Sequence, residues 1–340
     1  MKFTVRYSYN LDLLNLMNVL TGEEFYVNWH KNISKLFGEQ LSDYSKSCVK
    51  EAVEIMGSAM LGPYLSLVVS AVPNFEKRTI TRMFSNTDFL RERFANFSYY
   101  DDKQWPDYAS VFSVLLPVVN ELESNGFHEY WKKVCLPSIR RVQRQFRAYA
   151  NKFQLDKDIE YMLGPGQAPG SITVFLSALS APHGIKICGP QYITDIAFPK
   201  KASLVTAIHE MFHPPYSTKD LEQELEQLGK DPLLKHAFET KDPRFGYSTM
   251  DGFIEENVVE AMAIFICNKV GLEDNPMEYF AKHDDGSHMF SVVLYDYFHR
   301  YPKSGSQAFQ AYFRELLQKM PVGSLDREYR EIQSSACPEL

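Results

Sequence analysis

The sequence predicts an α+β protein that is mostly helical and contains a small, mainly antiparallel sheet. Apolar residues recur three and four positions apart over most of the chain, which is the spacing of one face of a helix. Strand-like runs of alternating or β-branched residues are confined to residues 1–10 and 171–198. The 24 Phe and 20 Tyr residues supply large apolar side chains for substantial cores.

The first ten residues, MKFTVRYSYN, alternate apolar and polar side chains as a strand does. Helical spacing then dominates from Leu11 to about Asp156. From Lys200 onward the chain is again mostly helical. Between these helical parts, three further strands are expected at residues 171–179, 184–188 and 191–198.

Residues 55–72 contain no charged side chain and approach the length of a membrane span. Gly57, Gly62 and Pro63 interrupt the run, and three serines dilute it. We therefore expect a buried, kinked core helix and no membrane contact, with a membrane segment as the alternative.

The strongest break in the chain is the segment GPGQAPG at residues 164–170, with three glycines and two prolines. It predicts a helical N-terminal region with an initial strand over residues 1–165 and a second region over residues 166–340. One integrated fold is the alternative, because the N-terminal strand needs partners that the helical half does not supply.

Charge and composition limit the classes of partner. Thirty-six Lys and Arg residues stand against 43 Asp and Glu residues, and the net charge of −7 gives no electrostatic case for nucleic acid. The N-terminus lacks the apolar run and cleavage site of a signal peptide, so we expect a cytoplasmic protein. Five scattered cysteines without a Cys-x-x-Cys pair predict reduced thiols.

The segment His209-Glu210-Met-Phe-His213 lies in an apolar run that favours a helix. Positions i and i+4 share one face of a helix, so both imidazoles can reach one ion at about 2.0–2.1 Å. Glu210 is then placed to act as general base on metal-bound water. This is the His-Glu-x-x-His (HExxH) pattern of zinc hydrolases.

An alternative is a buried helix whose two histidines are satisfied by hydrogen bonds in the core. Pro214 and Pro215 follow His213 at once, so the helix should stop or bend at the second histidine.

A catalytic zinc site normally needs a third protein ligand. Residues 251–267 predict a helix whose latter half is apolar and therefore buried. Glu256 and Glu260 share a face of it, so one can bind zinc while the other accepts a hydrogen bond from a ligand histidine. Glu255 is the rival ligand. The alternative is that these acids lie on a solvated first turn, where they favour the helix dipole.

Together these residues resemble the gluzincins, the thermolysin-like clan of zinc metallopeptidases. The clan combines HExxH on one helix, a ligand Glu on a later helix and often an acid four residues after it. The matching residues are His209, Glu210, His213, Glu256 and Glu260, and the resemblance covers about residues 170–270. It implies a zincin-like active-site helix, Zn²⁺ as cofactor and hydrolysis of peptide bonds in a peptide or protein substrate.

The resemblance also implies catalytic roles. Glu210 takes a proton and returns it to the leaving amine, while a Tyr or His stabilises the oxyanion. Tyr247, between the two metal helices, is the first choice for that stabilising role. For His288 we favour a buried structural role, and transition-state stabilisation is the second interpretation. The strand at 191–198 is expected to be a sheet edge that pairs with an extended substrate.

The competing hypothesis is a catalytically silent zincin-like scaffold, or a metal-binding interaction module whose helical half binds a partner. Glu210 favours the enzyme, because a purely structural zinc site has no use for a general base.

Overall fold

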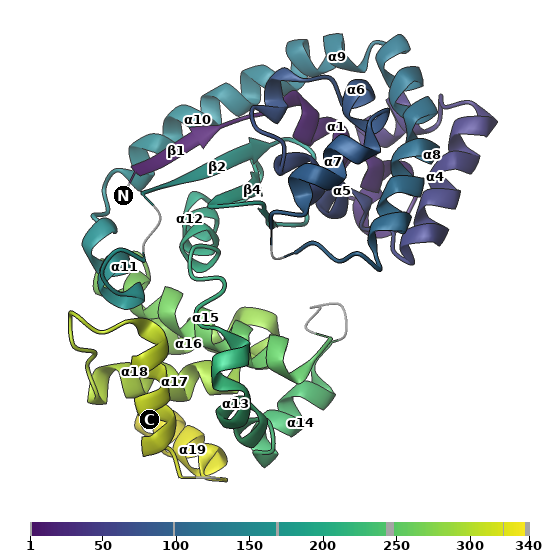
Figure 1. Ribbon diagram of the computed structural model, residues 1–340. Helices are drawn as coiled ribbons and strands as arrows, with labels where there is room; N and C mark the ends of the chain where they lie inside the picture. Colours follow the sequence, from purple (N-terminus) through teal and green to yellow (C-terminus); the bar gives the residue numbers. More distant parts are fainter. Residues whose placement is uncertain (1, 98, 168–169, 243–247, 322, 337–340) are drawn as a thin grey trace. The chain divides into compact units, whose positions relative to one another are not determined.

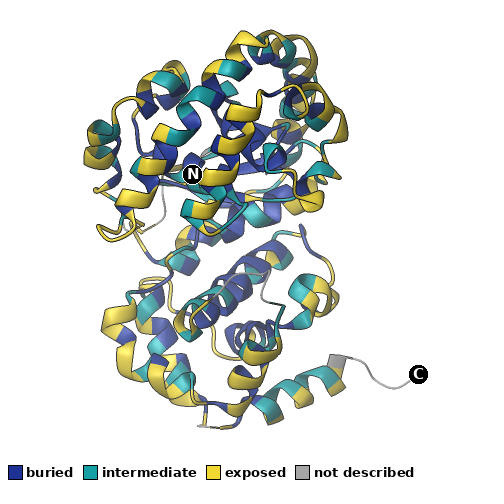
Figure 2. Ribbon diagram, turned by 90° about the vertical axis from the view of Figure 1, so that its right-hand side faces the viewer, coloured by how far each residue is buried: buried dark blue, intermediate teal, exposed yellow. Residues whose placement is uncertain are grey.

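The computed structural model describes residues 2–97, 99–167, 170–242, 248–321 and 323–336. Helices dominate, and the strands form one four-stranded sheet, which confirms the α+β class (Figure 1). Figure 2 shows that the helices expose one side and bury the other. The chain forms two compact units. We call Phe3–Ala150 with Ser171–Ser203 the sheet unit, and Asn151–Gly170 with Leu204–Leu340 the C-terminal unit, to which Met1–Lys2 is also assigned.

The units are interleaved along the chain and do not follow the expected division at residue 165. Strands from beyond the GPGQAPG break join the sheet unit because β2 (Ser171–Ser177) lies next to the N-terminal strand β1 (Lys2–Arg6) in the sheet. Helix α11 (Asp156–Leu163), which precedes the break, belongs to the C-terminal unit. Pairing between distant strands therefore overrides the local break.

The sheet has the order β1-β2-β4-β3. β2 runs parallel to β4 (Gln191–Asp195), whereas β3 (Ile185–Ile187) is antiparallel to β4. The sheet is thus mixed, and the expectation of a mainly antiparallel sheet is corrected. The reason is the path of the chain, because β3 and β4 form a hairpin whose second strand returns between β2 and β3.

The same topology corrects the expected substrate strand. β4 is hydrogen-bonded to β2 on one side and to β3 on the other, so it has no free edge. An edge strand offers unpaired backbone groups, and an inner strand does not. Residues 191–198 therefore do not offer the edge that pairing with a substrate requires.

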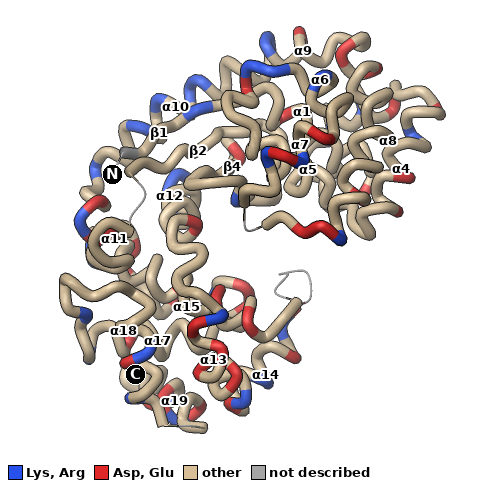
Figure 3. Tube along the Cα trace, viewed as in Figure 1, with Lys and Arg blue, Asp and Glu red and all other residues tan. Residues whose placement is uncertain are grey.

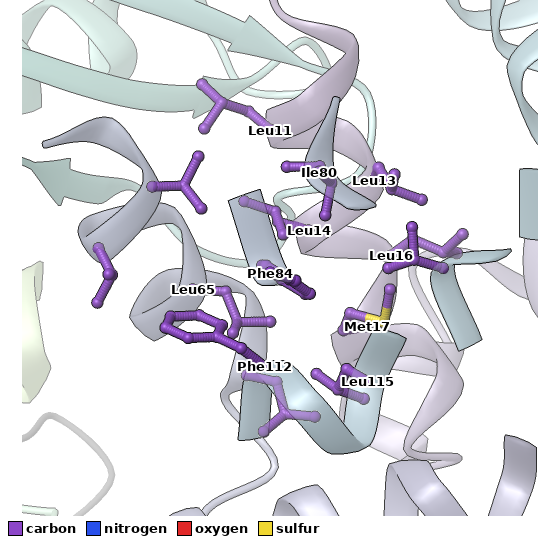
Figure 4. Close-up of a cluster of buried hydrophobic side chains, with 14 of the residues drawn as sticks. Leu11, Leu13, Leu14, Leu16, Met17, Leu65, Ile80, Phe84, Phe112 and Leu115 are labelled. Atoms are coloured by element: carbon purple, nitrogen blue, oxygen red, sulfur yellow. The ribbon is translucent and has the colours of Figure 1, made fainter. Parts of the chain in front are cut away.

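The helices of the sheet unit surround the almost fully buried α1 (Tyr9–Leu20). Apolar side chains of α1, such as Leu14 and Met17, lie among Leu65, Phe84 and Phe112 in the core (Figure 4). The other helical elements are α2 (Glu24–Val27), α3 (Lys31–Ile33), η1 (Ser34–Gly38), α4 (Asp43–Met56), α5 (Leu61–Ser70), η2 (Phe75–Lys77), α6 (Ile80–Phe84), α7 (Thr87–Phe94), α8 (Trp105–Ser124), α9 (Phe127–Tyr130), η3 (Trp131–Cys135) and α10 (Leu136–Ala150).

The uncharged run at 55–72 forms the end of α4 and the whole of α5, bent by 79° at the break between them. Leu61, Leu65 and Val68 of α5 are buried in the core, as expected. Within the described ranges, no single helix has the length and apolar composition to cross a membrane. The bent pair α4–α5 meets that test of length and composition only when both helices are counted together.

Helix α10 is basic on its exposed side, where four Arg residues lie and Figure 3 shows a row of blue positions. On its other side Ile139 and Phe146 are buried, and the helix contacts β2 of the sheet. Gln143 and Arg147 both donate hydrogen bonds to the carbonyl oxygen of Val5 in β1, at 2.7 and 2.6 Å. Part of this positive charge therefore ties the helix to the sheet.

The C-terminal unit is helical and is built around α15 (Met250–Lys269), which is apolar almost all round and buried. Helix α17 (Met289–Arg300) packs against it, and the Ser291 hydroxyl donates a 2.8 Å hydrogen bond to the Asn257 carbonyl. The remaining elements are α12 (Lys200–His209), whose first four residues group with the sheet unit, η4 (Thr218–Leu221), α13 (Glu222–Leu228), α14 (Pro232–Thr240), α16 (Pro276–Lys282), η6 (His283–Gly286), α18 (Phe309–Lys319) and α19 (Leu325–Ala336).

Candidate metal centre

The first histidine of the motif is the last residue of α12, which ends at His209. The next residues continue as turns, with the Glu210 N–H bonded to Thr206 O at 2.9 Å and the Phe212 N–H bonded to His209 O at 2.9 Å. Pro214 and Pro215 have no N–H to donate, so the helix cannot extend past His213. His213 therefore lies beyond the helix, in a bend, and the expected single helical face for both histidines is corrected.

The carboxylates of the site come from the N-terminal half of α15. This helix starts after Thr249, whose hydroxyl accepts a 3.1 Å hydrogen bond from the Gly252 N–H. The apolar side chains that follow are buried and fix the helix in the core. As a result Glu260 is 1% exposed, and the side chains of Glu256 and Glu255 are 14% and 26% exposed. The alternative of a solvated first turn does not hold for Glu260.

Three side chains converge on one point. The Nε2 atoms of His209 and His213 lie 3.1 Å apart. One carboxylate oxygen of Glu256 is 2.9 Å from the first of these nitrogens, and the other is 3.4 Å from the second. Ligands bound at about 2.0–2.1 Å around a tetrahedral ion are separated by roughly 3.3 Å. These three residues can therefore hold one metal ion.

Each histidine has a carboxylate of its own on the other ring nitrogen. Nδ1 of His209 donates to Oε2 of Glu260 at 2.7 Å, and Nδ1 of His213 donates to Oε1 of Glu255 at 2.9 Å. A carboxylate in this position fixes the tautomer that leaves Nε2 free for a metal. The geometry thus separates Glu256, which faces both Nε2 atoms, from its neighbour Glu255.

The electrostatics of the site suit a cation. Burial alone raises the pKa of the Glu256 carboxyl, but His209 and His213 outweigh burial and hold that pKa at about 2. Burial lowers the pKa of His209, yet Glu256 and Glu260 outweigh it and keep that pKa well above its ordinary value. In the part of the chain that the structure describes, all ion pairs of Glu255, Glu256 and Glu260 are with histidines. Within the described part of the chain, no Lys or Arg side chain forms an ion pair with any of these three glutamates.

The remaining predicted residues have different surroundings. Glu210 directly follows His209 and is half-buried. Tyr247 lies outside the described residues. His288 precedes α17, is 1% exposed and packs its ring against Phe253 and His283, so it is not one of the three converging side chains.

Sequence reasoning missed the surroundings of Glu260. Oε1 of Glu260 is 3.7 Å from Nε2 of His283, and the ring of Tyr279 stacks on His283 at 5.2 Å. The spacing of acid and histidine residues in the run His283-Asp-Asp-Gly-Ser-His288 was the available signal.

Comparison with models of known protein families, with curated proteins and with solved structures found no match.

Proposed function

We propose that this protein is a zinc-dependent peptidase of gluzincin type, with His209, His213 and Glu256 as zinc ligands and Glu210 as general base. The observation that supports it best is the convergence of two Nε2 atoms and one carboxylate within 2.9–3.4 Å of one another. Two imidazoles and a carboxylate are a frequent ligand set of catalytic zinc.

In the proposed reaction, each residue of the site has a separate role. Bound zinc would polarise the scissile carbonyl and lower the pKa of water. The Glu210 carboxylate would take a proton from the attacking water and pass it to the nitrogen of the leaving amine. Glu255 and Glu260 would hold the two imidazoles in the tautomer that binds metal. Tyr247 stays our first choice as the donor to the oxyanion.

One observation, the position of Glu210 directly after the first ligand histidine, favours a hydrolase over other uses of this ligand set. Two histidines and a carboxylate also hold iron(II) in oxygenases, but such sites do not need a glutamate next to the first ligand. A catalytically silent scaffold or a metal-binding module would equally have no use for Glu210. The adjacent base is therefore the feature that separates the peptidase from these alternatives.

The test compares the wild type with Glu210→Gln and with the control Glu222→Gln, which alters an exposed residue of α13. Metal in the purified proteins would be identified by mass spectrometry, and hydrolysis would be followed with a mixed peptide library. We expect zinc in all three proteins and a loss of activity of about 10²–10⁴-fold in E210Q alone.

Zinc without hydrolysis by the wild type would favour the binding module. If the reconstituted wild type binds no more zinc than the variant His209→Ala/His213→Ala, the peptidase and the metal-binding module are both excluded.

A further inference from the structure

A second group of metal-ligand side chains lies in the C-terminal unit. His283, Asp284 and His288 each place one ligand atom within 4.8 Å of the other two. Nε2 of His288 is 3.6 Å from Oδ2 of Asp284. None of these residues belongs to the set formed by His209, His213 and Glu256.

The backbone brings this group together in an uncommon conformation. Helix α16 ends at Lys282, and the chain then makes a turn in which Asp284 and Asp285 adopt φ values of 42° and 53°. Left-handed conformations of residues other than glycine are uncommon and persist where the surroundings enforce them. The turn places Asp284 back against His288 at the start of α17.

The two imidazoles of the group differ in their access to solvent. The His288 side chain is fully buried, and its ring centroid is 5.6 Å from that of His283. The His283 side chain is 35% exposed, so an ion can approach from that side. Glu260 adds negative charge, because its Oε1 is 3.7 Å from Nε2 of His283. The group thus offers two nitrogen donors and one carboxylate, with a second carboxylate close by.

We propose that His283, Asp284 and His288 bind a second divalent cation. Two imidazoles with a carboxylate select borderline transition metals, of which zinc is the usual occupant in proteins. Glu260 lies between the two groups, with Oε2 on His209 and Oε1 facing His283. An ion held by His283 would therefore also fix the carboxylate that orients His209. This site does not depend on the proposed peptidase activity.

Metal stoichiometry provides the test. The protein would be stripped with a chelator, dialysed against Zn²⁺ alone, and its bound zinc counted by mass spectrometry. We expect two ions in the wild type and one in Asp284→Asn. The matched control is Asp285→Asn, which removes the same charge from the exposed neighbouring residue and should keep two ions. Asn tolerates the left-handed conformation, so both variants can keep the turn.

The variant His209→Ala/His213→Ala removes the zinc ion of the first site. It should therefore bind one zinc ion, at the second site. Two zinc ions bound to D284N would overturn the second site. So would a single ion in the wild type that is lost in H209A/H213A. Neither result would contradict the proposed peptidase. One ion in H209A/H213A together with none in D284N/H209A/H213A would support it. If circular dichroism shows that D284N is unfolded, His283→Asn replaces it at a half-buried position with the same expected loss of one ion.

Discussion

Oε1 of Glu255 lies 2.9 Å from Nδ1 of His213, whereas Oε2 of Glu256 lies 3.4 Å from Nε2 of the same ring. Adjacent glutamates therefore contact the two different nitrogens of one imidazole. Because only one of these nitrogens faces His209, the contact gives the two carboxylates different expected roles in metal binding.

Replacing these glutamates one at a time should show the difference. Glu255→Gln should weaken zinc binding by about 10–100-fold, as expected for a group that only orients a ligand. Glu256→Gln should weaken it further, because a direct ligand is lost. Competition with a chromophoric chelator measures both affinities. A larger loss of zinc affinity in E255Q than in E256Q would mean that Glu255 is the ligand and that Glu256 orients His213.

Glu260 should support zinc binding from a fully buried position. Glu260→Gln replaces an anionic acceptor on Nδ1 of His209 with a neutral amide, so affinity should fall about 10–100-fold. A 100-fold loss removes up to about 2.7 kcal/mol of zinc-dependent stabilisation. Thermal unfolding with and without zinc would show a smaller shift in Tm for E260Q. The control Glu278→Gln, at an exposed pair with Lys282, should keep the full shift.

Zinc binding should release a proton. Burial lowers the pKa of His209, but Glu256 and Glu260 raise it well above its ordinary value, so the ion-free imidazole is protonated at neutral pH. That proton stabilises the ion-free fold below the unfolded pKa of about 6.5, and the stabilisation is lost as pH rises through the folded pKa. Because the metal needs a free Nε2, zinc should bind more tightly with rising pH.

Calorimetry at pH 7.5 in two buffers of different ionisation enthalpy measures this linkage. We expect about one proton released per ion bound. The same heat in both buffers would contradict a protonated His209.

Asp12 should make the stability of the sheet unit depend on pH. It is fully buried, and its carboxylate accepts hydrogen bonds from the Trp131 indole at 2.6 Å and the Ala178 N–H at 2.8 Å. Burial raises its pKa from 3.8 to about 6, although the hydrogen bonds oppose this rise. The native state therefore binds the proton more tightly than the unfolded chain, and stability falls as pH rises from about 4 to 6, by about 3 kcal/mol.

Urea unfolding followed by Trp fluorescence can measure this, because all three Trp residues, at 29, 105 and 131, belong to the sheet unit. The difference in unfolding free energy between pH 4.5 and 7.5 should shrink in Asp12→Asn. It should be unchanged in Asp88→Asn, which alters an exposed residue of α7. An equal pH dependence in D12N and wild type would refute the prediction.

Gly62 should be required for the packing of α5 on α1. A Cβ at this position would lie 2.8 Å from Cα of Asn15, and backbone cannot move aside cheaply. Alanine normally stabilises a helix by about 1 kcal/mol relative to glycine, but overpacking costs typically about 1–3 kcal/mol. Gly62→Ala should therefore lower the urea midpoint. In Gly38→Ala the new Cβ makes only ordinary contacts of 3.6 Å, so the midpoint should not fall. A higher urea midpoint in G62A would contradict this prediction and would show that the backbone of α1 moves to accommodate the added methyl group.

Several features could be read from the sequence because they depend on local pattern. Helical spacing predicted the helical character of both units, and the alternation in MKFTVRYSYN predicted β1. The break between Gly57 and Pro63 predicted the bend between α4 and α5. The parallel pairing of β2 with β4 could not be read in this way, because strand order depends on contacts between segments that local pattern does not encode.

The candidate site shows the same division. The sequence by itself determined the candidate donors: two imidazoles four residues apart, an adjacent glutamate and a buried helix with three glutamates, since residue type and spacing are local properties. Only the tertiary structure decided which carboxylate meets which nitrogen, because those contacts join residues 42 and 51 positions apart. It also decided that His283 and Asp284 turn back toward His288, since the left-handed conformation of Asp284 and Asp285 persists where the surrounding packing enforces it.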